Sequence, residues 1–101
     1  MTFDKEVKKR VLTVRMEGEL DEKSAGETRR YLDNAIREDR PARLLLDFSR
    51  VSFMDSTGIG VLLGRYKMLK ERDIEFCVTG INDQIDKVFR ISGLYQIIKA
   101  V

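Results

Sequence analysis

The segment Asp55-Ser56-Thr57-Gly58 places a hydroxyl group directly ahead of a stretch whose apolar residues have helical spacing. A serine at this point is a favoured helix N-cap, because its oxygen accepts a hydrogen bond from a free backbone N–H of the first turn. The same N–H groups and the helix dipole favour negative charge, so Ser56 is also a candidate phosphorylation site. A phosphate would add a charge of about −1.5 to −2 at pH 7, which suits an on/off switch of binding.

The sequence offers little support for catalysis. It contains no histidine, which removes the commonest general base and the commonest metal ligand. Ser56 lacks the G-x-S-x-G context of a nucleophile elbow, and neither a P-loop nor a dinucleotide-binding fingerprint is present. Cys77 is the single cysteine and lies in an apolar stretch, as expected of a buried residue in a reducing compartment. We therefore expect neither an enzyme nor a metal site.

The helix that follows Ser56 contains three glycines, Gly58, Gly60 and Gly64. Each glycine in a helix interior costs roughly 0.5–1 kcal/mol relative to alanine, so their presence needs a reason. At 100° per residue, one side of this helix gathers a predicted core-facing stripe. The stripe consists of Ile59, Leu62, Leu63, Tyr66 and Leu69. The opposite, predicted solvent-facing side consists of Thr57, Val61, Gly64 and Met68, with Gly60 and Glu71 flanking it.

We interpret the solvent-facing side as a smooth surface on which a partner protein can lie closely. Small residues admit the partner's backbone, and a methionine adapts to its contours. Arg65 and Lys67 lie at the edges of this side, where they can add charge steering. The alternative is that the glycines allow close packing on a sheet, and that Val61 and Met68 are ordinary exposed apolar residues.

The first half of the chain predicts a strand and a helix. Period-two alternation within residues 7–20 is typical of a half-buried strand. Ser24 and Glu27 form a capping-box pattern at the start of an amphipathic helix over residues 24–38. Pro41 marks the end of that helical region.

The second half continues the alternation of strands and helices. The nearly continuous apolar run Leu44–Phe48 predicts a strand that is covered on both faces. A short strand over 73–80, a helix over 82–94 with Gly93 at its end, and a closing strand over 95–100 follow the glycine-bearing helix. This order favours the α/β class with right-handed crossovers, although the sequence leaves open whether helices cover one face or both.

Length and charge narrow the class of protein further. The 101 residues suit one compact domain, residues 1–101. The 19 basic and 17 acidic residues give a net charge of +2, which provides no general argument for nucleic-acid binding. No apolar run approaches the roughly 20 residues that span a bilayer, and the charged opening segment has no signal-peptide pattern. We expect a cytoplasmic protein without a membrane partner.

Three segments together resemble a known family. They are FMDSTGIGVLLGRYKMLK at 53–70, GELD at 18–21 and ISGLYQIIK at 91–99. In the same order and at similar spacing, they are similar to segments of the anti-sigma factor antagonists of the STAS domain family, most of all its sporulation members. The resemblance implies a mixed β-sheet of about four to five strands with helices packed mainly on one face.

The resemblance also implies a mechanism of partner switching. The unphosphorylated chain would bind an anti-sigma factor that is also a serine kinase, and would displace the sporulation sigma factor. The kinase would use Mg-ATP, which it binds itself, to phosphorylate Ser56, so this chain needs no cofactor of its own. A PP2C-type phosphatase would restore the active form. Asp21 would lie near the serine, although it is equally well explained as a turn or N-cap residue ahead of the 24–38 helix.

The candidate site is therefore a phosphorylation site within a partner-binding surface. The phosphorylation site is Ser56. The surface comprises Asp21, Asp55, Ser56, Thr57, Gly58, Gly60, Val61, Gly64, Arg65 and Met68.

Three alternatives remain open on the sequence. One is an antagonist in a general stress sigma-factor pathway, with the same serine chemistry and a different kinase. Another is a phosphate- or nucleotide-binding module that uses the helix N-terminus at residues 56–58 as an anion site. A third is a purely structural scaffold domain, for which Ser56→Asp would affect no partner.

Overall fold

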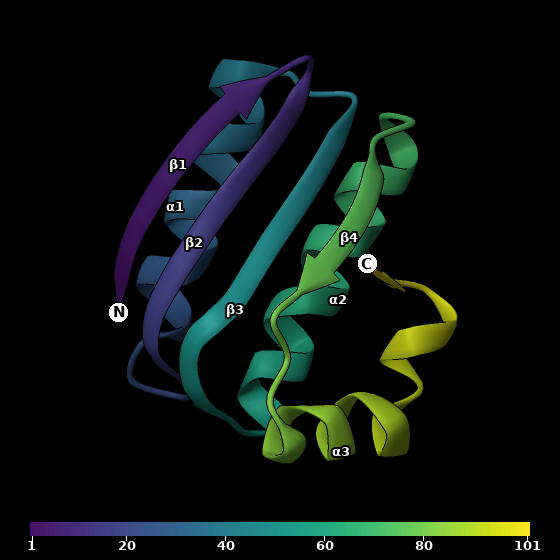
Figure 1. The fold of residues 1–101 in the computed structure, drawn as a ribbon. Helices are drawn as coiled ribbons and strands as arrows, with labels where there is room; N and C mark the ends of the chain where they lie inside the picture. The colour runs from purple at the N-terminus through teal and green to yellow at the C-terminus, as the bar shows by residue number, and fades with distance from the viewer.

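The computed structural model describes all residues, 1–101, as one five-stranded sheet with three helices (Figure 1). The strand order is β1-β2-β3-β4-β5, in which β1 is antiparallel to β2 and the other three pairs are parallel. In chain order the elements are β1 (Thr2–Lys8), β2 (Val11–Leu20), α1 (Ala25–Asp39), β3 (Arg43–Met54), α2 (Ser56–Glu71), β4 (Glu75–Thr79), α3 (Asp83–Ser92), a 3-10 turn (Leu94–Gln96) and β5 (Lys99–Ala100). The predicted α/β fold with a small mixed sheet is confirmed.

The helices pack mainly on one face of the sheet, which leaves the other face open. In β3, Leu44, Leu46 and Phe48 are fully buried under the helices, whereas Leu45 and Asp47 between them are only half-buried. The prediction that this strand is covered on both faces is therefore wrong. Burial alternates along the strand, but the sequence does not show this, because leucine occupies both the buried and the half-buried positions.

The start of α1 differs from the predicted capping box. The Ser24 hydroxyl donates to the Glu19 carbonyl at 2.6 Å and accepts from the Asp21 N–H at 3.1 Å, so it caps no N–H of the first turn. The Asp21 carboxylate accepts instead from the N–H groups of Lys23 and Ser24, at 3.0 and 3.1 Å. Asp21 therefore stabilises the turn into the helix, as one of the two sequence interpretations expects.

The buried face of α2 lies about a quarter turn from the predicted one. Val61, expected on the solvent side, is 0% exposed, and Leu63, expected in the core, is 37% exposed. The buried residues of the helix are Gly58, Val61, Leu62 and Leu69.

An ion pair between helices accompanies this difference. The Arg65 side chain is only 12% exposed, and its Nε lies 2.9 Å from Oδ1 of Asp33 on α1. Arg65 thus occupies a place on the buried face, which a count of apolar spacing assigns to solvent. Its partner lies 32 residues away on another helix, so periodicity within α2 does not reveal it.

The C-terminal region agrees with the prediction in its helix but not in its strand. Asn82 caps α3 by accepting from the Ile85 N–H at 2.9 Å, and Gly93 ends the helix at φ +79°. The predicted closing strand is reduced to the two residues of β5, because the preceding 3-10 turn directs Leu94 and Ile98 into the core. No helix of the chain is long and apolar enough to cross a membrane.

Candidate functional site

Ser56 is the first residue of α2 and is exposed at the end of the molecule where β2 and β3 finish. The N-cap is not Ser56 but Asp55, whose Oδ1 accepts from the N–H groups of Thr57 at 2.9 Å and Gly58 at 3.4 Å. The prediction that Ser56 caps the helix is therefore wrong. With the cap supplied by its neighbour, the Ser56 side chain makes no hydrogen bond within the chain and its hydroxyl is free for modification.

Asp21 lies at the same edge of the sheet. The last paired residues of the parallel strands β2 and β3 are Leu20 and Met54, so Asp21 and Asp55 follow at neighbouring positions. The Asp55 N–H also donates to the Leu20 carbonyl at 3.3 Å, which joins the two turns. The predicted proximity of Asp21 to the start of α2 thus follows from strand pairing.

Two amide side chains of α3 and its cap hold the strand that leads to Ser56. Pairing between β3 and β4 ends at Asp47, and the rest of β3 has no strand on that side. There, Gln84 contacts both backbone groups of Met54: its Nε2 donates to the carbonyl at 2.9 Å, and its Oε1 accepts from the N–H at 3.1 Å. Asn82 Nδ2 donates to the carbonyls of Val51 and Ser52 at 3.2 and 3.3 Å.

Sequence reasoning did not identify these amides as part of the site. Asn82 carries a recognisable signal as a helix N-cap, but nothing local shows that its other side reaches β3. Gln84 carries no local signal, since its partner, Met54, is 30 residues earlier in the chain.

A shallow apolar groove runs between α2 and α3, with Ser56 among the residues that line it. Its volume is about 370 Å³. Ile91, at its α3 side, is 88% exposed, more than any other large apolar side chain of the protein. The lining residues are Ser56, Ile59, Gln84, Lys87, Val88, Ile91 and Ser92. The sequence did not predict the groove, because the groove forms only where α3 lies beside α2. The spacing of Val88 and Ile91, three residues apart, does place them on the same face of a helix.

The three glycines of α2 have different surroundings. A Cβ on Gly58 would come within 2.9 Å of the Met54 sulfur and 3.1 Å of Leu20 Cγ, so close packing requires glycine there. A Cβ on Gly60 or Gly64 would meet nothing within 4 Å. The packing interpretation therefore holds for Gly58 only, while the other two glycines leave open space on the helix surface.

The remaining residues of the predicted surface differ in how far they are exposed to solvent. Val61 is in the core, and Met68 is half-buried and packed against it. Arg65 is engaged with Asp33. Thr57 is half-buried. The exposed stripe of α2 instead contains Ser56, Gly60, Leu63, Lys67 and Lys70.

A network next to α3 contains the strongest electrostatic perturbations near the site. The Tyr95 hydroxyl donates to Asp86 Oδ1 at 2.6 Å, and Arg90 Nε donates to Asp86 Oδ2 at 2.7 Å. The Tyr95 bond, and then the Arg90 bond, lower the pKa of Asp86. Burial first, and the bond to Asp86 second, raise the pKa of Tyr95 to about 12. These groups attach the 3-10 turn to α3 and do not line the groove.

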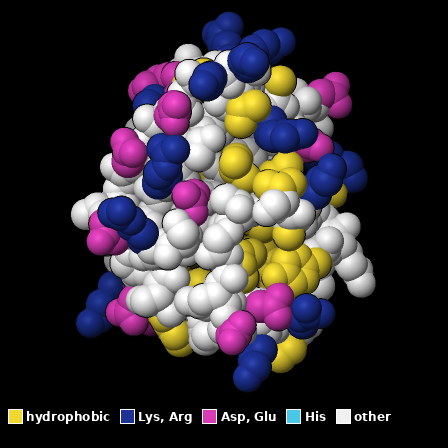
Figure 2. All heavy atoms as spheres, in the orientation of Figure 1, with side chains coloured by type: hydrophobic (Ala, Val, Ile, Leu, Met, Phe, Trp, Pro, Cys, Tyr) yellow, Lys and Arg dark blue, Asp and Glu magenta, His cyan; other side chains and the backbone are white.

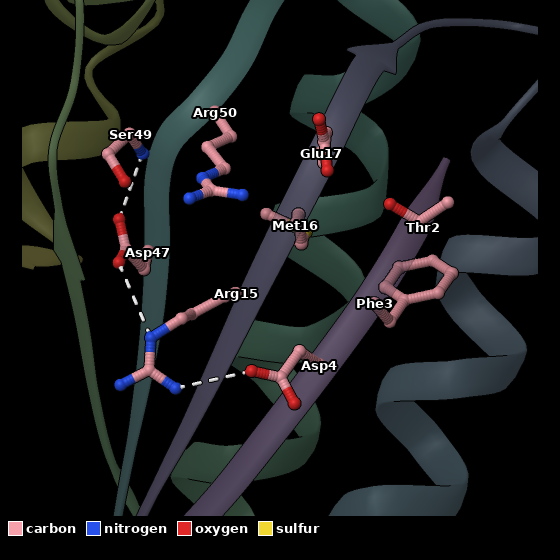
Figure 3. Close-up of a pocket in the computed structure, with 9 residues that line it drawn as sticks. All are labelled: Thr2, Phe3, Asp4, Arg15, Met16, Glu17, Asp47, Ser49 and Arg50. Carbon is pink, nitrogen blue, oxygen red and sulfur yellow. Dashed lines mark hydrogen bonds and ion pairs between the residues drawn. The ribbon is translucent and has the colours of Figure 1, made fainter.

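A second hollow lies on the open face of the sheet, and the arginine at its centre, Arg15, is already paired with carboxylates (Figure 3). Its volume is about 340 Å³. Arg15 points across it and lies 3.5 Å from Asp4 and 4.0 Å from Asp47, whose carboxylate accepts from the Ser49 N–H. Because the guanidinium and the carboxylates neutralise one another, this hollow is a weaker candidate than the groove beside Ser56.

The STAS domain family model matches residues 2–101, and the chain therefore belongs to the STAS domain family. Within that family it belongs with the anti-sigma factor antagonists. It is 37% identical over 87 residues to the anti-sigma F factor antagonist of Paenibacillus polymyxa, which covers 86% of this chain and 74% of the relative. It is 36% identical over 81 residues to the anti-sigma-B factor antagonist of Staphylococcus aureus, which covers 80% and 74%.

Solved structures agree with this placement. The anti-sigma factor antagonist SpoIIAA in its unphosphorylated form matches with a TM-score of 0.83 and 30% identity, over 99% of this chain and 88% of that chain. The Bacillus cell fate determinant SpoIIAA in the phosphorylated form matches with a TM-score of 0.74 and 30% identity, over 99% and 91%. The prediction of a regulatory antagonist rather than an enzyme is thus confirmed at the level of the family.

Proposed function

We propose that this chain antagonises an anti-sigma factor by binding it at the start of α2 and along the groove between α2 and α3. The observation that carries the proposal is the exposed, unbonded Ser56 hydroxyl at the groove with the exposed Ile91 on its far side. An apolar groove with a polar rim is the composition of a protein-binding surface. Gly60 adds space on the same exposed side of α2 for the partner's backbone.

Phosphorylation of Ser56 is the proposed switch. A phosphate there adds a charge of about −1.5 to −2 at pH 7 beside the carboxylates of Asp55 and Asp21. Because the Ser56 side chain is exposed and holds no hydrogen bond, the modification leaves the fold in place and changes only the surface that the partner meets. Like-charge repulsion and the desolvation of the phosphate then oppose binding.

The partner that fits this switch is an anti-sigma factor with serine kinase activity. It binds the Mg-ATP that supplies the phosphoryl group, and a PP2C-type phosphatase reverses the reaction in the cytoplasm. In support, the chain resembles SpoIIAA, of which both an unphosphorylated and a phosphorylated form have been solved.

The proposal is tested by incubating the protein with a sporulation anti-sigma kinase and Mg-ATP, followed by intact mass and fragment-ion mapping. We expect a gain of one phosphoryl group on Ser56 and none in Ser56→Ala, which should still bind the kinase. A kinase that is active on another antagonist but leaves this chain unmodified, and does not bind it, would contradict the proposal.

The choice of sigma factor is a second question within the same function. The sigma F and sigma B antagonists are nearly equal in identity to this chain, at 37% and 36%. We favour the sporulation pathway because the GRYKMLK segment at 64–70 resembles the sporulation members of the family. Comparing the affinities of a sporulation and a stress anti-sigma factor for the unphosphorylated protein decides between them.

The geometry argues against a nucleotide-binding module at the start of α2. The Asp55 carboxylate already accepts from the N–H groups of Thr57 and Gly58, which a bound phosphate would need. A bound phosphate would therefore meet the negative charge of the Asp55 carboxylate at the N–H groups that it needs.

A further inference from the structure

A pocket lined by three arginines lies at the end of the molecule opposite Ser56. Arg10 belongs to the turn between β1 and β2, Arg40 follows α1, and Arg72 follows α2. The pocket has a volume of about 310 Å³, and its other lining residues are apolar: Ile36, Pro41 and Ile74. Figure 2 shows dark blue side chains crowded at this end, above the β1–β2 turn.

The charges of these arginines are not neutralised within the chain. None of the three takes part in an ion pair, although nine ion pairs are formed elsewhere, and no carboxylate lines the pocket. The acidic residues at the end of α1, Glu38 and Asp39, are paired with Lys5. The pocket therefore holds three cations around an apolar floor with nothing to balance them.

Backbone hydrogen bonds fix the loops that carry the arginines to one another. The Arg10 carbonyl accepts from the N–H groups of Ala42 and Arg43, at 2.8 and 3.3 Å. The Ala42 carbonyl in turn accepts from the Glu75 N–H at 3.0 Å, which ties in the loop after Arg72. The backbone of the three loops is thus preorganised, while the exposed arginine side chains form no bond within the chain and are available to a ligand.

Two of the arginines occupy strained backbone positions. Arg10 has φ +64° and, with Lys9 at φ +52°, forms a two-residue hairpin turn in which both residues are left-handed. Asn-Gly is the favoured pair for such a turn. Arg40 ends α1 at φ +43°, where glycine is the usual residue. The left-handed conformation costs roughly 1–2 kcal/mol for a residue with a Cβ, so arginine at these positions opposes stability.

Favourable interaction with the helix dipoles does not account for this arrangement. A cation at a helix C-terminus gains typically 0.3–1 kcal/mol, which is at most comparable to the strain at Arg40. Arg10 gains no such stabilisation, because it lies on a turn between strands and not at the end of a helix. Strained residues that persist without a structural benefit point to a role in binding.

We propose that the arginine pocket binds the phosphate group of a small ligand, with the apolar floor receiving the rest of that ligand. Guanidinium groups match the geometry of phosphate oxygens and form paired, charge-assisted hydrogen bonds with them. Ile74 is partly exposed and offers contact to an apolar or aromatic portion, with Ile36 and Pro41 buried beside it. The pocket is separate from Ser56 and its proposed partner, so the two proposals stand or fall independently.

The test is a titration of the ¹⁵N-labelled protein with phenyl phosphate and with inorganic phosphate, followed by NMR. We expect saturable shifts of the amides of Arg10, Arg40 and Arg72, and tighter binding of phenyl phosphate. Arg10→Gly and Arg40→Gly should each weaken binding about tenfold while raising Tm, because glycine relieves the left-handed strain. Arg72→Gln should weaken binding without raising Tm.

Arg50→Gln is the matched control, because Arg50 is exposed, forms no ion pair and lies outside the pocket. It should leave the affinity unchanged. Equal weakening by Arg50→Gln would mean that only net charge matters, and would overturn the proposal. So would the absence of saturable binding, equal affinity for the two probes, or full affinity in the two glycine variants.

Discussion

At the scale of single residues, the start of α2 separates two roles that the sequence assigns to one serine. Asp55 supplies the helix cap, and Ser56 keeps an unbonded hydroxyl in solvent. A helix that depended on Ser56 for its cap would lose about 1 kcal/mol whenever that hydroxyl was altered. Here the group proposed for modification and the stabilising group are adjacent but different, so the proposed switch would leave the helix cap in place.

Replacing Ser56 with aspartate should test this separation of roles. We expect Ser56→Asp to bind the anti-sigma factor at least about tenfold more weakly, because it adds a fixed negative charge to the binding surface. The free energy of unfolding should stay within about 0.5 kcal/mol of wild type, as is usual for an exposed substitution. Calorimetric titration and urea unfolding measure the two quantities. An Asp variant with wild-type affinity would disprove the charge switch.

The glycines of α2 give a second prediction at this scale. Gly60→Ala and Gly64→Ala should each stabilise the free protein by about 0.5–1 kcal/mol, since a Cβ meets nothing within 4 Å. If the open space serves the partner, Gly60→Ala should at the same time weaken binding. Gly58→Ala is the contrasting variant and should destabilise, because its Cβ would collide with Met54. Thermal unfolding and titration with the partner distinguish these outcomes.

At the scale of elements, α3 is what completes the site. It forms one wall of the groove, and through Asn82 and Gln84 it fixes the end of β3 from which α2 starts. The position of Ser56 therefore depends on side chains more than 25 residues further along the chain.

Gln84→Ala should reveal that dependence. The variant removes two hydrogen bonds to Met54 and leaves its N–H and carbonyl without those partners, so we expect a loss of about 1–3 kcal/mol in the free energy of unfolding. Affinity for the anti-sigma factor should fall as well. Lys87→Ala, from the same helix and the same groove but without a bond to β3, should keep its stability.

The elements also show how far sequence reasoning can go. Strand alternation, the cap at Asn82 and the stop at Gly93 are local signals, and they placed most helices and strands correctly. The orientation of α2 depends on long-range contacts instead: the Arg65 side chain is only 12% exposed and pairs with Asp33 on another helix. The predicted exposure to solvent therefore holds at Ser56 and Gly60 and fails at Val61, which is in the core.

At the scale of the whole molecule, the response of stability to pH should report the Tyr95–Asp86 network. The folded-state pKa of Tyr95 is raised to about 12 from 10.0, so its contribution is complete below pH 10 and is lost as the pH rises toward 12. The pKa of Asp86 is lowered from 3.8, so its contribution is present above that pH and is lost as the pH falls below it.

Tyr95→Phe should flatten both dependences. The variant removes the phenol that titrates at high pH, and it removes the hydrogen bond that is the largest cause of the Asp86 shift. Urea unfolding from pH 3 to pH 11, compared with wild type, measures the difference between the two proteins, in which the contributions of all other groups cancel. Parallel curves for the two proteins would show that the network does not contribute to folding.

The two amides that hold the second half of β3 have a consequence for motion. Most of the sheet is closed by continuous backbone ladders, but on its β4 side this half-strand receives its hydrogen bonds from the side chains of Asn82 and Gln84. Local opening requires only the loss of the contacts in one region, and here that means releasing α3 rather than separating two strands. The Met54 amide, which donates to Gln84, should then exchange with solvent at a lower free energy than the amides of β2. Ser56, the proposed phosphorylation site, follows this segment directly, so release of α3 would change the backbone that leads to an exposed seryl side chain while the rest of the sheet stays closed.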